Sequence, residues 1–184
     1  MGASSSSGPI PLVCVPHVDI AKFMGTWYVI GVLPTIFETK CSNAIERYSF
    51  TNENDKRHIS IDFTYRNGDD PLRKEKSNKI KSLPQKGWVN DSKVGNEWKV
   101  SPFWLFKMPY LIIENDYSTC VIGYPSRKYA WIMARTPEID KVKYDDLVDK
   151  LSSKHGYDKA FVEKNIRKVP QVYDDEERKL RGLE

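Results

Sequence analysis

The stretch Gly25-Thr26-Trp27-Tyr28 decides how this chain is interpreted, because it opens an apolar run that continues to Leu33. Two later features give the stretch its weight. Asn115-Asp116-Tyr117 is a turn signal between two strand-like runs. Arg135 then ends the mostly apolar run that begins at Tyr129. A glycine-x-tryptophan, an aspartate-tyrosine turn and a lone arginine therefore follow one another in a chain of 184 residues, which is enough for one domain with tails.

Short strand-like runs separated by turn signals fill most of the chain. The turn signals include Asn67-Gly68-Asp69-Asp70-Pro71 and the segment from Pro84 to Gly87. Many short strands without intervening helices indicate an antiparallel sandwich or barrel, and eight strands can close a sheet around one small ligand. The predicted strands cover residues 25–33, 43–51, 57–66, 73–83, 95–101, 109–115, 117–124 and 129–135.

Helical patterns occur near both ends of this series. Residues 17–24 are expected to form a short helical turn. Between Thr136 and Lys154, apolar residues recur at i, i+3, i+4 and i+7, which predicts one helical face, and Gly156 follows as a C-cap. The segment from Ala160 to Ile166 is expected to be a last short strand, and the charged segment 174–184 to be frayed or loosely helical. The apolar helix positions are Tyr144, Leu147, Val148 and Leu151.

The glycine-x-tryptophan, the aspartate-tyrosine turn and the lone arginine, in this order, resemble the three signature regions of the lipocalins. The resemblance covers about residues 16–171 and is closest to the branch of bacterial outer-membrane lipocalins, apolipoprotein D and plant temperature-induced lipocalins. It implies an all-β fold: an eight-stranded antiparallel up-and-down β-barrel with one C-terminal α-helix and a short final strand. The implied organisation is a flexible leader over residues 1–16, a lipocalin domain over 17–171 and a charged C-terminal tail over 172–184.

The resemblance assigns structural roles to the signature residues. Trp27 would plug the narrow end of the barrel, and Arg135 would lay its guanidinium over the indole ring. Gly25 would allow close backbone packing, and Asp116 and Tyr117 would turn the chain at the same closed end. None of these five residues is expected to contact a ligand.

The resemblance also implies a ligand cavity, because alternate side chains of each strand point into the barrel. Fatty acids, lysophospholipids and retinoid- or sterol-like molecules are the implied ligands. Phe103, Trp104 and Phe106 are expected on the loop near the open mouth. An alternative is that the inward aromatic side chains simply fill the barrel as core. The predicted ligand-binding residues are Tyr48, Phe63, Tyr65, Trp104, Tyr110, Ile112 and Trp131.

The implied function is the binding and carriage of a small hydrophobic ligand, in lipid transport, storage or stress protection, with peripheral contact with a membrane as one option. We expect a monomer or weak dimer. Two alternatives belong to other functional classes. One is a lipocalin-fold enzyme that acts on a lipid or carotenoid, and the other is an interaction module that binds a protein through the aromatic residues of the mouth.

No catalytic activity, cofactor or metal site is predicted. The sequence contains no Gly-x-Ser-x-Gly, His-Glu-x-x-His or phosphate-loop motif. His17, His58 and His155 are scattered and are expected at the surface. The enzymatic alternative would require Cys120 to face inward with a lowered thiol pKa.

Cysteine usage favours free thiols. Cys14, Cys41 and Cys120 are an odd number, and their spacing is too wide for a zinc knuckle. Free thiols in a reducing compartment are preferred over a single disulfide. Cys41 stands where apolipoprotein D carries a bonded cysteine, but no C-terminal cysteine is present to pair with it, which argues against secretion.

Charge and leader composition bear on partners and location. The 29 basic and 25 acidic residues give a net charge of +4, without the dense basic stripe that nucleic-acid binding would need. The alternating Lys74, Lys76, Lys79 and Lys81 predict the solvated face of a strand, with weak attraction to anionic headgroups as the alternative. Without a membrane-length apolar run or a secretory leader, the expected location is cytoplasmic or peripheral to a membrane, or secreted if a leader has been removed.

The first six residues, Met1 to Ser6, match the N-myristoylation pattern, which requires glycine at position 2 and serine or threonine four residues later. Gly2 is therefore a candidate acylation site. A serine-rich flexible leader explains the same residues equally well. One acyl chain would give only marginal and reversible membrane binding.

Overall fold

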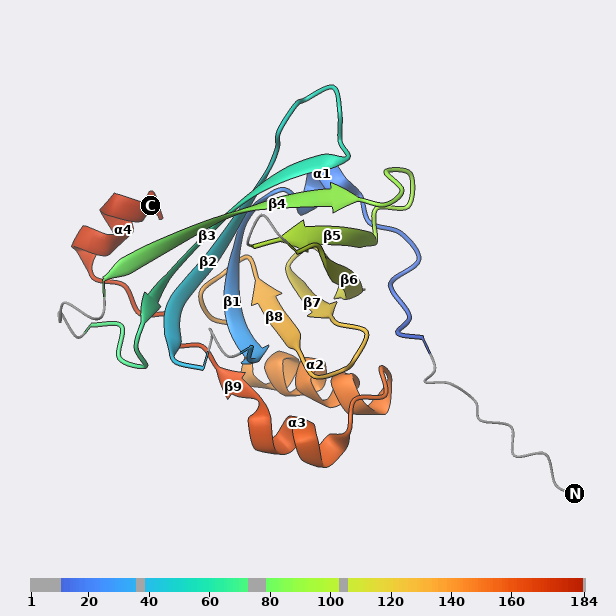
Figure 1. Ribbon diagram of the computed structural model, residues 1–184. Helices are drawn as coiled ribbons and strands as arrows, with labels where there is room; N and C mark the ends of the chain where they lie inside the picture. Colours follow the sequence, from blue (N-terminus) through green and yellow to red (C-terminus); the bar gives the residue numbers. More distant parts are fainter. Residues whose placement is uncertain (1–10, 36–38, 73–78, 103–105, 184) are drawn as a thin grey trace, which may run out of the picture.

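Eight consecutive antiparallel strands close into a barrel in a computed structural model that describes residues 11–35, 39–72, 79–102 and 106–183 (Figure 1). The first strand closes it: residues Gly25 to Tyr28 pair with the second strand, and residues from Tyr28 to Leu33 pair with the eighth. The lipocalin fold expected from the sequence is therefore present. The strands are β1 (Gly25–Leu33), β2 (Cys41–Phe50), β3 (His58–Asn67), β4 (Ile80–Val89), β5 (Glu97–Ser101), β6 (Met108–Asn115), β7 (Thr119–Gly123) and β8 (Ala130–Ala134).

The predicted fourth strand continues beyond its expected end, and the part of it predicted over residues 73–78 lies outside the described residues. It was expected over residues 73–83 with a turn from Pro84 to Gly87, but β4 runs from Ile80 to Val89 and contains that segment. Among the described residues, β5 pairs with Lys86 to Val89, and the residue that pairs with Pro84 is Asp62 of β3. A proline is tolerated where one side of a strand has no partner that needs its missing N–H. The prediction was wrong because proline was taken as a turn residue.

One helix covers the outer wall of the barrel. The predicted helical face forms α2 (Lys141–Ser153), with Tyr144, Leu147 and Leu151 buried. Asp140 caps its N-terminus by accepting hydrogen bonds from two backbone N–H groups of the first turn. A Cβ atom on Gly31 of β1 would lie 2.7 Å from the Tyr144 hydroxyl, so glycine permits the close approach of helix and strand.

The segment predicted as a last strand is mainly helical. Residues Ala160 to Ile166 were expected to be extended, but α3 (Lys159–Asn165) occupies most of them. The Asp158 side chain caps this helix by accepting a hydrogen bond of 2.7 Å from the Phe161 N–H. This capping aspartate is the signal that the periodicity argument overlooked. The short strand β9 (Arg167–Lys168) follows and pairs with Gly31 and Val32 of β1.

Both chain ends contain capped helices. The expected turn before the barrel is α1 (Ile20–Phe23), capped by Asp19. The charged C-terminal segment forms α4 (Asp175–Arg181), which lies apart from α2 and α3 (Figure 1). Glu177 and Arg181 of α4 are almost fully buried and form an ion pair of 3.0 Å. Of the two expectations for this tail, frayed or loosely helical, the helical one is confirmed, and the helix is docked through buried side chains.

The α4 contacts hold the tail against the outer face of β2 and β3. Arg66 of β3 donates a hydrogen bond of 2.8 Å to Glu177. Arg181 donates one of 2.8 Å to the backbone oxygen of Asn43. Removing one partner of such a buried ion pair strongly destabilises a protein, because the other charge stays buried.

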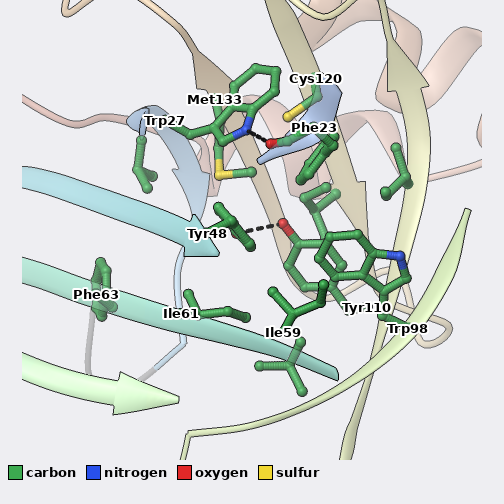
Figure 2. Packing of buried hydrophobic residues seen from close by; sticks show 14 of the residues in the cluster. Phe23, Trp27, Tyr48, Ile59, Ile61, Phe63, Trp98, Tyr110, Cys120 and Met133 are labelled. Carbon is green, nitrogen blue, oxygen red and sulfur yellow. Dashed lines mark hydrogen bonds between the residues drawn. The ribbon is translucent and has the colours of Figure 1, made fainter. Parts of the chain in front are cut away.

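Two hydrophobic clusters lie on opposite faces of the barrel wall. The inner cluster contains aromatic side chains that fill the closed half of the barrel, among them Phe23, Trp27, Tyr48 and Trp98 (Figure 2). The outer cluster joins Ile30 and other outward residues of the wall to α2 and α3. The alternation of inward and outward side chains along the strands produces both clusters.

The signature residues meet at the closed end of the barrel. Trp27 is fully buried, and the guanidinium carbon of Arg135 lies 3.8 Å from the centre of its ring. Arg135 also donates hydrogen bonds to the backbone oxygens of Thr26 at 2.8 Å and Lys22 at 2.7 Å. Gly25 has a φ of +97°, in the region that favours glycine.

The turn between β6 and β7 adjoins this end. The Asp116 carboxylate accepts hydrogen bonds from the backbone N–H groups of Ser118 and Thr119. The Tyr117 hydroxyl accepts a hydrogen bond of 2.8 Å from the Asp19 N–H, and the Tyr117 carbonyl accepts one from Arg135. The turn thus connects the helical cap α1 to the arginine that covers the tryptophan.

His155 departs from the expected surface position. It is 6% exposed and lies just after α2, where its Nε2 is 2.7 Å from Glu114 of β6. Burial lowers the pKa of His155, although Glu114 opposes that shift. Lys154 and His155 hold the pKa of Glu114 below its usual value, against the opposing effect of burial. The sequence argument missed this contact because Glu114 is 41 residues away in the chain.

Replacing Arg135 at the closed end tests how much this side chain contributes to the free energy of unfolding. We expect Arg135→Ala to lower the free energy of unfolding by about 2–4 kcal/mol, because it removes a cation–π contact and several charge-assisted hydrogen bonds to carbonyls. Urea denaturation measures the change. Arg178→Ala, at an exposed position of α4, is the control and should change stability by less than about 0.5 kcal/mol. Equal effects of the two substitutions would contradict the assigned role.

His155 predicts a pH dependence of stability. Its pKa is lowered in the folded state, so the unfolded chain binds the proton more readily, and stability should fall as pH drops through the ordinary histidine range near 6.5. The lowered pKa of Glu114 extends the loss towards lower pH. Urea unfolding at pH 8 and pH 5.5 measures this. His155→Gln should reduce the difference between the two values, and His17→Gln, at an exposed position, should leave it unchanged.

Candidate functional site

A cavity of about 500 Å³ occupies the open half of the barrel. Strands β2, β3, β4, β5, β6 and β8 all contribute to its wall, and the loops near the mouth complete it. Most of the wall is aromatic or aliphatic. The lining residues are Thr35, Glu46, Phe63, Tyr65, Leu83, Gln85, Val100, Pro102, Phe106, Met108, Pro109, Tyr110, Tyr124, Tyr129 and Trp131.

The structure brings four of the predicted ligand-binding residues together at this cavity. Phe63, Tyr65, Tyr110 and Trp131 all line it. The rings of Phe63 and Tyr65 are stacked, with centroids 5.0 Å apart, and form a flat apolar wall on β3. Their contact with a ligand remains a prediction.

Two other predicted residues lie deeper in the barrel. Tyr48 and Ile112 are 2% and 0% exposed and belong to the inner cluster, not to the lining of the cavity. Tyr48 pairs with Gly25 at the start of β1, next to the closed end. The alternative of core filling therefore describes these two residues. Trp104 and Phe103 lie outside the described residues.

The loop at the mouth contributes one described aromatic residue. Phe106 lines the cavity and is nevertheless 70% exposed. A large apolar side chain in this position contacts both solvent and the cavity entrance. Tyr124 and Tyr129 lie on the connection between β7 and β8 and face one another edge to face, with centroids 5.5 Å apart.

The sequence argument missed the polar part of the site. Glu46 lines the cavity, as do Gln85 and Thr35, and none of the three was predicted. The signal for Glu46 was available: it stands two residues before Tyr48, so the period of a strand gives both residues the same face. The predicted set comprised six aromatic residues and Ile112, so it contained no acidic residue.

A short series of polar groups connects Glu46 to the inner cluster. The Tyr48 hydroxyl donates a hydrogen bond to the Glu46 carboxylate and lies 2.7 Å from the Tyr110 hydroxyl, a contact drawn in Figure 2. Tyr110 stacks on Trp98, with ring centroids 5.3 Å apart. Burial, with the charge of Glu46 as a second cause, raises the pKa of Tyr110 well above 10. Tyr110 therefore stays neutral.

Cys120 faces inward but lacks the property that the enzymatic alternative requires. It is fully buried in the inner cluster beside the aromatic residues of the closed end (Figure 2). Burial raises the pKa of its thiol well above 9, and the charge of Glu46 acts in the same direction. A neutral thiol is a poor nucleophile. None of the three cysteines, Cys14, Cys41 and Cys120, forms a disulfide.

The described ranges contain neither a metal-binding cluster nor a membrane-spanning helix. No three histidine, cysteine, aspartate or glutamate side chains gather there in a way that could hold a metal ion. None of the helices in the described part of the chain combines the length and the apolar character needed to cross a bilayer.

The barrel, its closed end and its cavity can now be compared with known proteins. A family model described as a lipocalin-like domain matches residues 18–167. The chain belongs to the lipocalin family. Lipocalins are usually binding proteins for small hydrophobic molecules and usually not enzymes.

The curated relatives of this lipocalin include plant and bacterial proteins. It is 29% identical over 164 residues to temperature-induced lipocalin-1 of Arabidopsis thaliana, an alignment that covers 85% of this chain and 81% of the relative. It is 26% identical over 161 residues to the outer membrane lipoprotein Blc of Escherichia coli K12, covering 86% of this chain and 84% of the relative.

Solved structures show the same fold at lower identity. Insecticyanin from the tobacco hornworm Manduca sexta matches 92% of this chain and 87% of its own, with a TM-score of 0.63 and 13% identity. The cockroach allergen Per a 4 matches 90% of this chain and 95% of its own, with a TM-score of 0.60 and 15% identity. At these identities the likeness concerns the fold alone.

The reactivity of the Cys120 thiol, inside the barrel of this lipocalin, can be measured directly. In a Cys14→Ser/Cys41→Ser variant, Cys120 is the remaining thiol. We expect iodoacetamide at pH 8 to alkylate it at least ~100-fold more slowly in the folded protein than in urea, because it is buried and neutral. Mass spectrometry over time gives both rates. A folded-state rate close to that of the unfolded chain would reopen the case for a reactive thiol.

Proposed function

We propose that this lipocalin binds one small lipid-like molecule in its cavity and carries or stores it. The observation that carries the proposal is the cavity itself: about 500 Å³, open at one end, closed by Trp27 at the other, and lined mainly by aromatic and aliphatic side chains. Cavities that hold small molecules are typically 300–1,000 Å³ and have this mostly apolar lining with a few polar groups.

Burial of an acyl chain supplies the driving force. Each buried methylene contributes about 0.8 kcal/mol, so ten of them contribute roughly 8 kcal/mol before the cost of ordering the ligand is subtracted. The stacked Phe63 and Tyr65 and the indole of Trp131 offer a continuous apolar surface for such a chain. Fatty acids, lysophospholipids and retinoid- or sterol-like molecules are candidates on shape alone.

We further propose that the protein acts at or near a membrane surface, as a monomer or weak dimer. Support comes from Phe106, which is 70% exposed at the mouth, where a lipid would enter. The names of two relatives, an outer membrane lipoprotein and a temperature-induced lipocalin, point to a membrane and to induction by temperature. The Gly2 acylation motif agrees with a membrane location but lies outside the described residues.

The enzymatic alternative has weaker support. Its one nucleophile candidate, Cys120, is neutral and does not line the cavity. The protein-binding alternative rests on the mouth aromatics, of which Phe106 alone lies in the described part of the chain. The protein-binding alternative does not account for an apolar cavity of this size.

Substitution of two tryptophans, one that lines the cavity and one that does not, tests the location of the ligand. We expect Trp131→Ala to weaken binding of a fluorescent fatty-chain probe by about 10-fold, because it removes a large apolar contact from the cavity wall. Fluorescence titration measures the affinity. Trp88→Ala is the matched control, since Trp88 does not line the cavity and its ring lies beside Lys107 instead. The proposal fails if wild-type protein binds no such probe, or if both substitutions weaken binding equally.

A further inference from the structure

The connection between β7 and β8, residues 124–129, carries two tyrosines of the cavity wall. Strand register places this connection at the mouth: Gly123 pairs with Ala130, and Ala130 pairs with Leu33 at the end of β1 that is farthest from the closed end. Tyr124 and Tyr129 stand at the two ends of the connection, and both line the cavity. A displacement of this connection would therefore change the width of the entrance.

The connection holds a backbone conformation that its own residues do not favour. The Arg127 N–H donates a hydrogen bond of 2.8 Å to the Tyr124 carbonyl, which closes a tight turn. Arg127 has a φ of +56°, in a region that residues other than glycine rarely adopt. Such a conformation persists where surrounding contacts impose it. Contacts from outside the connection are therefore needed to maintain its shape.

The segment that follows α2 supplies such contacts. The Tyr157 hydroxyl accepts a hydrogen bond of 3.2 Å from the Tyr124 N–H and donates one of 3.0 Å to the Tyr129 carbonyl. One hydroxyl group thus joins both ends of the connection. In the middle of it, Nε of Arg127 donates a hydrogen bond of 2.8 Å to the His155 carbonyl.

The segment from His155 to Tyr157 is itself anchored on two elements. Tyr157 is 3% exposed in the outer cluster, and its N–H donates a hydrogen bond of 2.9 Å to the carbonyl of Leu151 in α2. The His155 ring lies 2.7 Å from Glu114 of β6. The middle of the connection, in contrast, is exposed to solvent. When the contacts between the two segments open, the connection is therefore the part that moves.

We propose that Tyr157 is a positioning residue for the cavity and sets the rate at which ligand enters and leaves. Its hydroxyl holds Tyr124 and Tyr129 in the wall, and opening of this contact moves the connection outward and widens the entrance. Tyr157 does not line the cavity, so it acts on the entrance without contact with the ligand. The inference rests on the proposed function, because it concerns access to the same cavity.

Removal of one oxygen atom tests the role of Tyr157. Tyr157→Phe keeps the buried ring and deletes both hydrogen bonds. At the usual strength of such bonds, we expect the association and dissociation rate constants of a fluorescent fatty-chain probe each to rise about 10-fold in stopped-flow experiments. The affinity should change by less than ~3-fold, because opening becomes easier in the free and the loaded protein alike. Hydrogen exchange, followed by mass spectrometry, should accelerate in peptides that cover residues 124–129.

Two further variants complete the experiment. Tyr144→Phe is the matched control, since it removes a tyrosine hydroxyl from the same outer cluster at the contact of α2 with Gly31, and it should leave both rate constants within ~2-fold of wild type. Arg127→Gly deletes the contact with the His155 carbonyl while glycine accepts the positive φ, so it should also raise both rate constants. It decides the matter if Tyr157→Phe does not fold.

The outcomes separate this inference from the proposed function. Unchanged rate constants in Tyr157→Phe and Arg127→Gly would overturn the role of Tyr157 while leaving the cavity a lipid site. Faster dissociation without faster association would overturn it too, because Tyr157 would then support the bound ligand's wall and not the entrance. Failure of the wild-type protein to bind the probe would instead overturn the proposed function itself.

Discussion

The contact between Arg135 and Trp27 closes one end of the barrel, and the cavity depends on that closure. The guanidinium covers the indole and donates to carbonyls of the segment that leads into β1. The Trp27 N–H in turn donates to the Phe23 carbonyl at 2.8 Å, so the helical cap α1 is tied to the same point. A barrel open at both ends would admit water to both ends of its interior. Closure at one end allows the other half to remain hollow and largely apolar without losing the packed core beneath it.

Closure also determines which side chains face the ligand space. β1 pairs with β2 near the closed end and with β8 towards the mouth, so this one strand connects the registers of both neighbours. A shift of one residue would turn every inward side chain outward. With the observed register, Glu46 and Tyr48 of β2 point inward, and Arg47 between them contacts the C-terminal helix α4 outside. Strand β2 therefore contributes an inward side chain to the cavity wall and an outward side chain to the contact with α4.

Local patterns predicted much of this structure, and long-range contacts account for most of what they missed. The strand at residues 25–33 and the helix around Leu147 follow from periodicity within a few residues, and the signature residues placed the closed end. Periodicity cannot predict that Glu114 lies against His155. It also cannot predict that Arg66 and Asn43 bind side chains of the charged tail, because the fold brings these distant partners together. The turn predicted inside β4 and the strand predicted at α3 are different errors: a proline and a capping aspartate were given the wrong weight.

The same distinction explains why the apolar wall was easier to predict than the acceptor within it. Aromatic residues at alternate positions are a strong local pattern, and four of those predicted do line the cavity. A single glutamate in a strand is, by pattern alone, an ordinary solvent-facing residue. The inward position of Glu46 follows from its pairing with Trp27 and Phe63. A leucine at that position would pack with a smaller cost of desolvation than a carboxylate. A polar group held in such a place stabilises the protein little by itself. Here the carboxylate accepts a hydrogen bond from the Tyr48 hydroxyl, so the fold that creates this inward position also supplies a donor for it.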